Sequence, residues 1–146
     1  MATASRSRTI SADPSAIWDV LADFGALSRW ADGIDHSCLL RRRDDPIGTS
    51  RRVQVGRDTL VETIAVFDAP RELAYDIEGL PQWFSVSNQW NIRSHAGSPT
   101  TVTLTSVVQM RPNPLRPIAE RVFAGLMARR SDELLNSLAK HLERTR

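Results

Sequence analysis

The residue with the clearest chemical potential is an acid inside an apolar strand. Side chains alternate between the two faces of a strand, so the face that buries Leu60 and Ile64 also buries Glu62. A buried carboxylate needs a partner, and Arg51 is inward on the preceding strand by the same count. Two roles stay open for Glu62. It is either a water-facing or rim salt-bridge residue, or a buried acid that orients a ligand or transfers a proton.

Two further polar residues share this inward parity. Asn88 lies between Val86 and Trp90, where its amide could hydrogen-bond a ligand carbonyl or hydroxyl. The Tyr75 hydroxyl could do the same while its ring lines the wall, although an ordinary core tyrosine fits the pattern as well. The candidate catalytic residues are therefore Glu62, Asn88, Tyr75 and Arg51.

No metal site and no cofactor is predicted. The spacing of His36, His95 and His141 does not gather them with Cys38, the single cysteine. The sequence also lacks a nucleophile elbow, a glycine-rich phosphate loop, a cysteine pair and a zinc-binding histidine helix. Catalysis by shape and by positioned polar groups remains open, because it leaves no short motif.

Charge gives no support to a nucleic-acid partner. The net charge is only +2, and the basic run Arg41–Arg43 is followed directly by Asp44 and Asp45. A solvated strand end with a charged turn explains this run.

Length and composition favour one domain over residues 1–146. The polar start and the short apolar runs predict no secretory signal and no integral membrane segment. We expect a soluble cytoplasmic protein, either a monomer or a homodimer.

The periodicity of the chain predicts the order strand, two short helices, six strands and one long helix. A weak strand at Arg6–Ser11 ends at Asp13-Pro14, an N-cap followed by proline that starts a helix. A second short helix ends near Asp32-Gly33. Runs of β propensity separated by turn clusters then continue to Met110, and such short connections favour antiparallel pairing.

The last helix is predicted to be amphipathic and about 28 residues long. Its expected apolar stripe consists of Ile118, Val122, Phe123, Leu126, Met127, Leu134, Leu138 and Leu142. The expected polar face consists of Glu120, Arg121, Arg129, Asp132, Glu133, Asn136, Lys140 and Glu143.

Besides the long last helix, three segments have a recognisable pattern: SADPSAIWDVL (11–21), LSRW (27–30) and VETIAVFDAPRELAY (61–75). In these features the sequence resembles the polyketide cyclase/dehydrase and lipid-transport superfamily, which is also called START-like or SRPBCC. This resemblance implies an α+β helix-grip fold, in which a seven-stranded bent antiparallel sheet wraps round the long helix. It also implies a cavity between the sheet and that helix, while saying little about any reaction.

The more apolar parity of each strand, with inward residues of the helices, predicts the ligand-binding wall. This wall comprises Trp30, Leu40, Val53, Val55, Ile64, Ile77, Phe84, Val86, Trp90, Val108, Met110, Phe123, Leu126 and Met127.

Three functions are consistent with these features. The first is binding of a small hydrophobic molecule, such as a lipid, polyketide or isoprenoid, in the cavity. The second is a polyketide aromatase or cyclase, with Glu62 as acid or base and with Asn88, Tyr75 and Arg51 polarising carbonyl oxygens. The third is a protein-partner or quinone-binding module.

Overall fold

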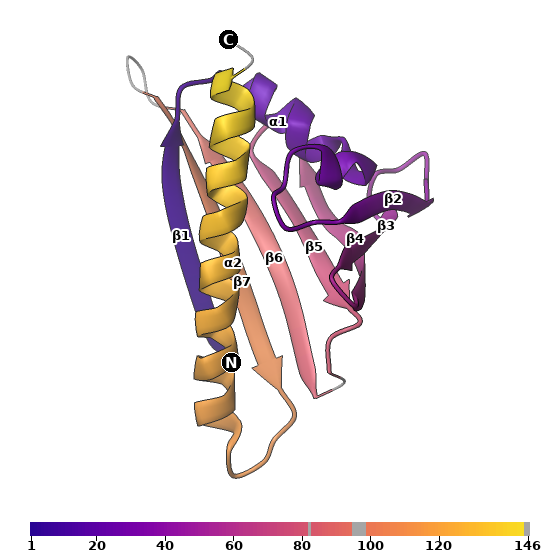
Figure 1. The fold of residues 1–146 in the computed structure, drawn as a ribbon, viewed down its shortest axis with the longest axis vertical. Helices are drawn as coiled ribbons and strands as arrows, with labels where there is room; N and C mark the ends of the chain where they lie inside the picture. Colours follow the sequence, from indigo (N-terminus) through magenta and orange to yellow (C-terminus); the bar gives the residue numbers. More distant parts are fainter. Residues whose placement is uncertain (82, 95–98, 145–146) are drawn as a thin grey trace.

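The computed structural model describes residues 1–81, 83–94 and 99–144. All seven strands form one antiparallel sheet in the order β1-β7-β6-β5-β4-β3-β2 (Figure 1). The strands are β1 (Ala2–Ile10), β2 (His36–Arg41), β3 (Ser50–Val55), β4 (Asp58–Asp68), β5 (Glu72–Glu78), β6 (Phe84–Arg93) and β7 (Thr100–Met110). The predicted α+β helix-grip fold is thus confirmed, although β1 begins four residues earlier than expected.

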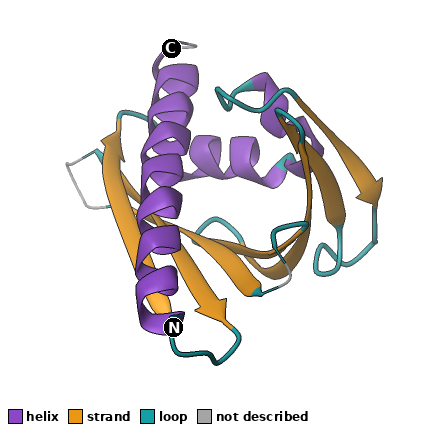
Figure 2. Ribbon diagram, turned by 60° about the horizontal axis from the view of Figure 1, so that its bottom comes forward, coloured by secondary structure: helices purple, strands orange, loops and turns teal. Residues whose placement is uncertain are grey.

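The sheet is bent, and the helices lie on its inner side (Figure 2). Register shifts interrupt β4 between Ile64 and Val66 and β2 between Leu39 and Arg41. Such irregularities increase the local twist of a sheet and help it to curl. The turn expected at residues 95–99 lies, apart from Pro99, outside the described residues.

The first short helix begins where the sequence predicts, whereas the second ends at Arg29, before the expected end near Asp32-Gly33. Asp13 is extended at the N-cap of α1 (Pro14–Ala22), and Pro14 occupies the first turn, where its fixed φ suits a helix. Ile17, Trp18 and Leu21 of α1 are buried. The next turns form a 3₁₀ helix, η1 (Phe24–Arg29), which packs on β2 and β3.

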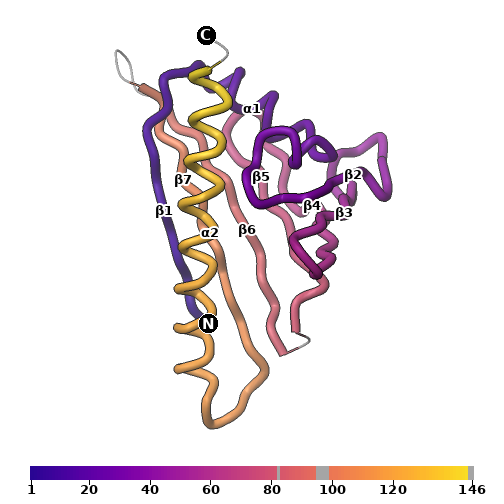
Figure 3. The backbone as a smooth tube through the Cα atoms, in the orientation of Figure 1, coloured from indigo at the N-terminus to yellow at the C-terminus, as the bar shows by residue number. Residues whose placement is uncertain are grey.

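The long helix α2 (Arg116–Arg144) packs along β1 and β7. Its second half follows the predicted stripe, since Leu134, Leu138 and Leu142 are buried. Figure 3 shows the amino terminus beside the first half of α2.

The predicted faces of the first half of α2 are only partly right, because Phe123 and Met127 pack against the core as expected but other residues do not follow the prediction. Ile118, Val122 and Leu126 are 65%, 62% and 55% exposed, whereas Glu120, expected on the polar face, is buried. Small residues make the contact with the sheet instead, because Ala124 and Ala128 are both buried and let the helix approach closely. Ile118, Val122 and Leu126 therefore point away from the sheet.

Leu40 is a second correction. It is 53% exposed rather than inward. It lies on the edge strand β2, at the register shift between Leu39 and Arg41, and such a shift breaks the alternation on which the prediction depended.

Candidate functional site

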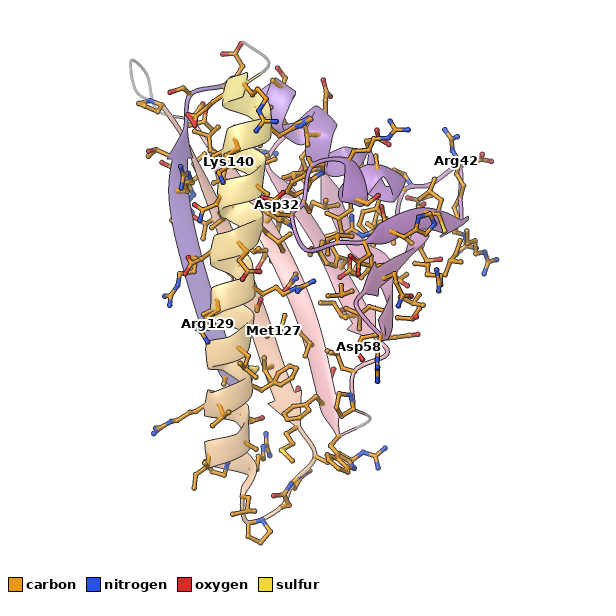
Figure 4. All side chains as sticks on the ribbon, in the orientation of Figure 1. Asp32, Arg42, Asp58, Met127, Arg129 and Lys140 are labelled. Carbon is orange, nitrogen blue, oxygen red and sulfur yellow. The ribbon has the colours of Figure 1, made fainter. Side chains whose placement is uncertain are left out.

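A cavity of about 360 Å³ lies between η1, strands β3 to β6 and the middle of α2. Its wall is mainly aliphatic, with contributions from Leu27, Ile34, Val53, Val55, Leu60, Ile77, Leu80, Pro81, Met127 and Leu134. In Figure 4, Met127 lies on the side of α2 that faces Asp58, which begins β4 across this space. The volume is at the lower end of the range for small-molecule pockets.

One wall of the cavity contains a buried ion pair. Arg51 and Glu62 are cross-strand neighbours on β3 and β4, and their side chains are 4% and 8% exposed. Nε and Nη2 of Arg51 each lie 2.7 Å from Oε1 of Glu62. The predicted burial and pairing of Glu62 are therefore confirmed, and a water-facing position is excluded.

Contacts other than the ion pair also hold the Arg51 side chain in place. Its Nη1 donates to the Phe24 carbonyl oxygen at 3.0 Å. Its guanidinium carbon lies 3.8 Å from the Phe24 ring centre and 4.8 Å from that of Tyr75, so two aromatic faces also stabilise the cation. Glu62 lines the cavity, and its Oε2 accepts no hydrogen bond from any other described residue.

A second polar group lies beside the ion pair. Tyr75, Asn88 and Ser106 are in register across β5, β6 and β7. The Ser106 hydroxyl donates to Oδ1 of Asn88 at 2.6 Å, which leaves Nδ2 of Asn88 to donate to the Tyr75 oxygen at 3.4 Å. Nε1 of Trp90 donates to the same oxygen at 3.2 Å.

The oxygen of the Tyr75 hydroxyl thus accepts two hydrogen bonds. The hydroxyl hydrogen can still be donated to a further acceptor. Within the described part of the chain, no acceptor lies within hydrogen-bonding reach of that hydrogen. Burial raises the pKa of the Tyr75 phenol, and the nearby Glu62 carboxylate raises it further, against smaller lowering effects of Arg51, Asn88 and Trp90. Tyr75 consequently stays protonated at neutral pH.

Residues 1–143 match the family described as polyketide cyclase/dehydrase and lipid transport. The chain belongs to this family. Membership of this family implies a ligand-binding cavity. A comparison with curated proteins found no match.

Solved structures share the fold at low sequence identity. The Zhui aromatase/cyclase from Streptomyces sp. R1128 aligns with a TM-score of 0.80 at 19% identity, over 98% of this chain and 94% of its own. A START superfamily protein from Mycobacterium smegmatis aligns with a TM-score of 0.76 at 14% identity, over 99% of both chains. A structure from Thermobifida fusca gives 0.81 at 22% identity, over 99% of this chain and 95% of the other.

For this member of the polyketide cyclase/dehydrase and lipid-transport family, the polar candidates from the sequence come together. Glu62, Tyr75 and Asn88 line the cavity, and Arg51 lies directly behind Glu62. Their chemical roles remain predictions.

The predicted apolar wall divides into four groups. Val53, Val55, Ile77 and Met127 line the cavity. Trp30, Ile64, Val86, Trp90 and Val108 are buried in the core without lining it, and Phe84, Met110 and Phe123 are partly buried beyond it. Leu40 and Leu126 are exposed, so their predicted place in the wall is wrong.

Several wall residues were missed by sequence reasoning. Met127, Arg130 and Leu134 all line the cavity and are spaced i, i+3, i+7 along α2. Because this spacing places residues on one side of a helix, Arg130 and Leu134 could have been predicted as wall residues from Met127. Leu80 and Pro81 come from the loop after β5, where alternation gives no guidance.

No metal centre is apparent in the described ranges, because no three His, Cys, Asp or Glu residues there are grouped closely enough. Likewise, none of the helices in those ranges is long and apolar enough to cross a membrane.

Proposed function

We propose that this protein binds a small, uncharged, mainly apolar molecule that carries a hydrogen-bond-accepting oxygen. The observation that carries the proposal is the composition of the cavity wall, which is aliphatic apart from a few converging polar groups. Burying apolar ligand area against such a wall contributes about 25 cal/mol per Å² before the costs of binding.

The ion pair favours an uncharged ligand. The charges of Arg51 and Glu62 cancel, since Nε and Nη1 of Arg51 already donate hydrogen bonds to Glu62 and Phe24, and Nη2 lies 2.7 Å from the same Glu62 oxygen. A charged ligand group placed against this neutralised pair would find no free counter-ion there, because the two remaining charged residues of the lining, Asp58 and Arg130, are exposed and half-buried rather than part of the buried wall.

The Tyr75 hydroxyl favours an acceptor oxygen on the ligand. Its hydrogen is available, and the bonds it receives from Asn88 and Trp90 make it a stronger donor. The Oε2 atom of Glu62 adds an acceptor for a ligand hydroxyl. A ketone, quinone or enone on an apolar skeleton has the required complementarity.

Two probes of matched shape test this proposal, methyl naphthyl ketone and isopropenylnaphthalene, which differ only in C=O against C=CH₂. We expect the wild-type protein to bind both, and the ketone about fivefold to tenfold more tightly. Tyr75→Phe should abolish this difference, and the infrared carbonyl band of the bound ketone should move to lower frequency only in the wild type.

The outcomes separate the two parts of the proposal. If neither probe binds, the cavity does not hold apolar ligands and the proposed function is wrong. If both bind equally well and the carbonyl band is unmoved, only the role of Tyr75 fails. Near-ultraviolet circular dichroism checks that Tyr75→Phe keeps its fold, since Asn88 and Trp90 lose an acceptor.

A second candidate function is an aromatase or cyclase. It is favoured by the placing of a carboxylate (Glu62), a neutral O–H donor (Tyr75) and an amide (Asn88) on one cavity wall, where they could act as base and carbonyl-polarising groups. The likeness in fold to the Zhui aromatase/cyclase is compatible with it. With a linear poly-β-ketone thioester as substrate, Glu62→Gln should slow cyclisation about a hundredfold or more. Unchanged turnover in Glu62→Gln would show that Glu62 has no role in the cyclisation.

A further inference from the structure

A row of exposed aliphatic side chains runs from the residue before α2 into the first half of this helix. We call Leu115, Ile118, Val122 and Leu126 the outer row; they are 66%, 65%, 62% and 55% exposed. Spacings of three and four residues place them on one side of the helix, over about 16 Å of its axis. Single exposed hydrophobic residues are ordinary on a protein surface, but a contiguous row marks an interaction site.

An exposed tryptophan lies at the same end of the molecule. Trp83 is 56% exposed, and its carbonyl oxygen accepts a hydrogen bond from the backbone N–H of Arg111 in the segment that leads into α2. The next residue, Phe84, stacks on Phe123 of α2 with ring centres 4.3 Å apart. Tryptophan prefers the boundary between lipid and water.

The charge around the outer row is positive. Five arginines occur between residues 111 and 131, namely Arg111, Arg116, Arg121, Arg129 and Arg130. The one acid in this segment, Glu120, is buried and bonded to the amino terminus and to Arg116. The exposed surface at the start of α2 thus presents aliphatic and cationic groups together.

The positive charge favours an anionic lipid surface over a second copy of the chain as the partner of this region. A second copy of the chain, paired through the same surface, would set arginines against arginines across a two-fold axis. A surface of anionic lipids offers phosphates to the arginines and an apolar boundary to the aliphatic side chains.

The outer row is also continuous with the edge of the cavity. Arg130 lies four residues after Leu126, so the two side chains are neighbours on the surface of α2, and Arg130 and Met127 both line the cavity. Figure 4 shows Met127 and Arg129 on opposite sides of α2, with Met127 toward the cavity. A partner surface that covers the outer row would therefore lie close to the cavity that an apolar ligand enters from water.

We propose that the outer row, with Trp83 and the neighbouring arginines, docks on the surface of a bilayer that contains anionic lipids. The aliphatic side chains enter the headgroup boundary, and the long arginine side chains reach the lipid phosphates. The association is peripheral and reversible, and it goes beyond the proposed binding of a ligand in the cavity.

Vesicle flotation with the full chain tests the proposal. The vesicles are phosphatidylcholine alone, or phosphatidylcholine with about a third phosphatidylserine. We expect binding to the anionic vesicles at low salt, little binding to the neutral ones, and loss of binding as salt screens the arginines.

Two double variants, each with a matched control elsewhere on the protein, test whether the outer row and its arginines form the docking surface. Val122→Ser with Leu126→Ser should weaken binding about tenfold or more, whereas Leu40→Ser with Ile47→Ser, which changes two exposed apolar residues elsewhere, should not. Removing two charges by Arg121→Gln with Arg129→Gln should weaken binding about thirtyfold. Arg42→Gln with Arg57→Gln, outside the surface, is the matched control for charge.

Tryptophan fluorescence supplies an independent measurement. Trp18, Trp30 and Trp90 are buried, so a blue shift on adding anionic vesicles reports on the exposed Trp83 and should vanish in Trp83→Phe. Absence of binding to anionic vesicles at low salt would overturn the proposal. So would binding that Val122→Ser with Leu126→Ser leaves unchanged. Self-association that this variant abolishes, without vesicle binding, would instead identify the outer row as a homodimer interface.

Discussion

At the scale of single residues, the buried ion pair is the most consequential feature of the site. Arg51→Met removes the cation and leaves the Glu62 carboxylate buried without its partner. We expect the free energy of unfolding to fall by about 3–5 kcal/mol. Combining Arg51→Met with Glu62→Leu should recover most of that loss, because no unpaired charge remains. Urea unfolding measures both, and a single variant as stable as the wild type would contradict the account.

Glu120 provides a pH-dependent prediction at the same scale. A hydrogen bond from the amino-terminal ammonium group, together with bonds from the Met110 N–H and Arg116, lowers the pKa of Glu120 below its usual 4.5, against a partial rise due to burial. In the acid range the unfolded chain therefore binds more protons. The contribution of Glu120 to stability is full above pH 4.5 and is lost as the pH falls through the lowered pKa.

Thermal unfolding between neutral pH and about pH 3 checks this expectation. Glu120→Gln should lower the melting temperature at neutral pH and flatten its fall in acid. Glu133→Gln, at an exposed position on the same helix, serves as the control and should do neither. Equal acid sensitivity of wild type and Glu120→Gln would show that this carboxylate is not the group responsible.

At the scale of elements, replacing each of two glycines by alanine should change the stability of the protein in opposite directions. Gly79, which follows β5 and lines the cavity, has φ +101°, and a Cβ there would lie 2.4 Å from the Thr59 carbonyl oxygen. Gly125 lies within α2 with open space around it. Gly79→Ala should destabilise the protein by more than about 1 kcal/mol, whereas Gly125→Ala should stabilise it by up to about 1 kcal/mol. Chemical denaturation of both variants is the measurement, and effects of the same sign would contradict the described backbone.

The α2 helix shows where prediction from the sequence ends. Each step of four residues advances about 40° round a helix, so side chains from Ile118 to Leu142 spiral through about 240°. No single flat surface can cover such a stripe. The sequence could therefore predict the helix and its buried second half, but not which part of the spiral meets the sheet. That depends on the close approach at Ala124 and Ala128, whose small side chains carry little hydrophobic signal.

At the scale of the whole molecule, the order and spacing of elements predicted the fold well. Alternation within strands also located Glu62 and Arg51, because both lie in regular parts of β3 and β4. It could not separate core from cavity wall, since Trp90 and Val53 share an inward parity yet only Val53 reaches the cavity. That distinction depends on how far the helices stand from each part of the bent sheet.

The central claim is that an uncharged apolar ligand occupies the cavity between the sheet and α2. Methyl-resolved NMR of the protein with bound methyl naphthyl ketone tests it most directly, through nuclear Overhauser effects from ligand protons to protein methyl groups. The account predicts contacts with Val53, Ile77 and Met127, and none with Ile118 or Val122. Contacts confined to the outer row, or no contacts at a saturating ligand concentration, would contradict it.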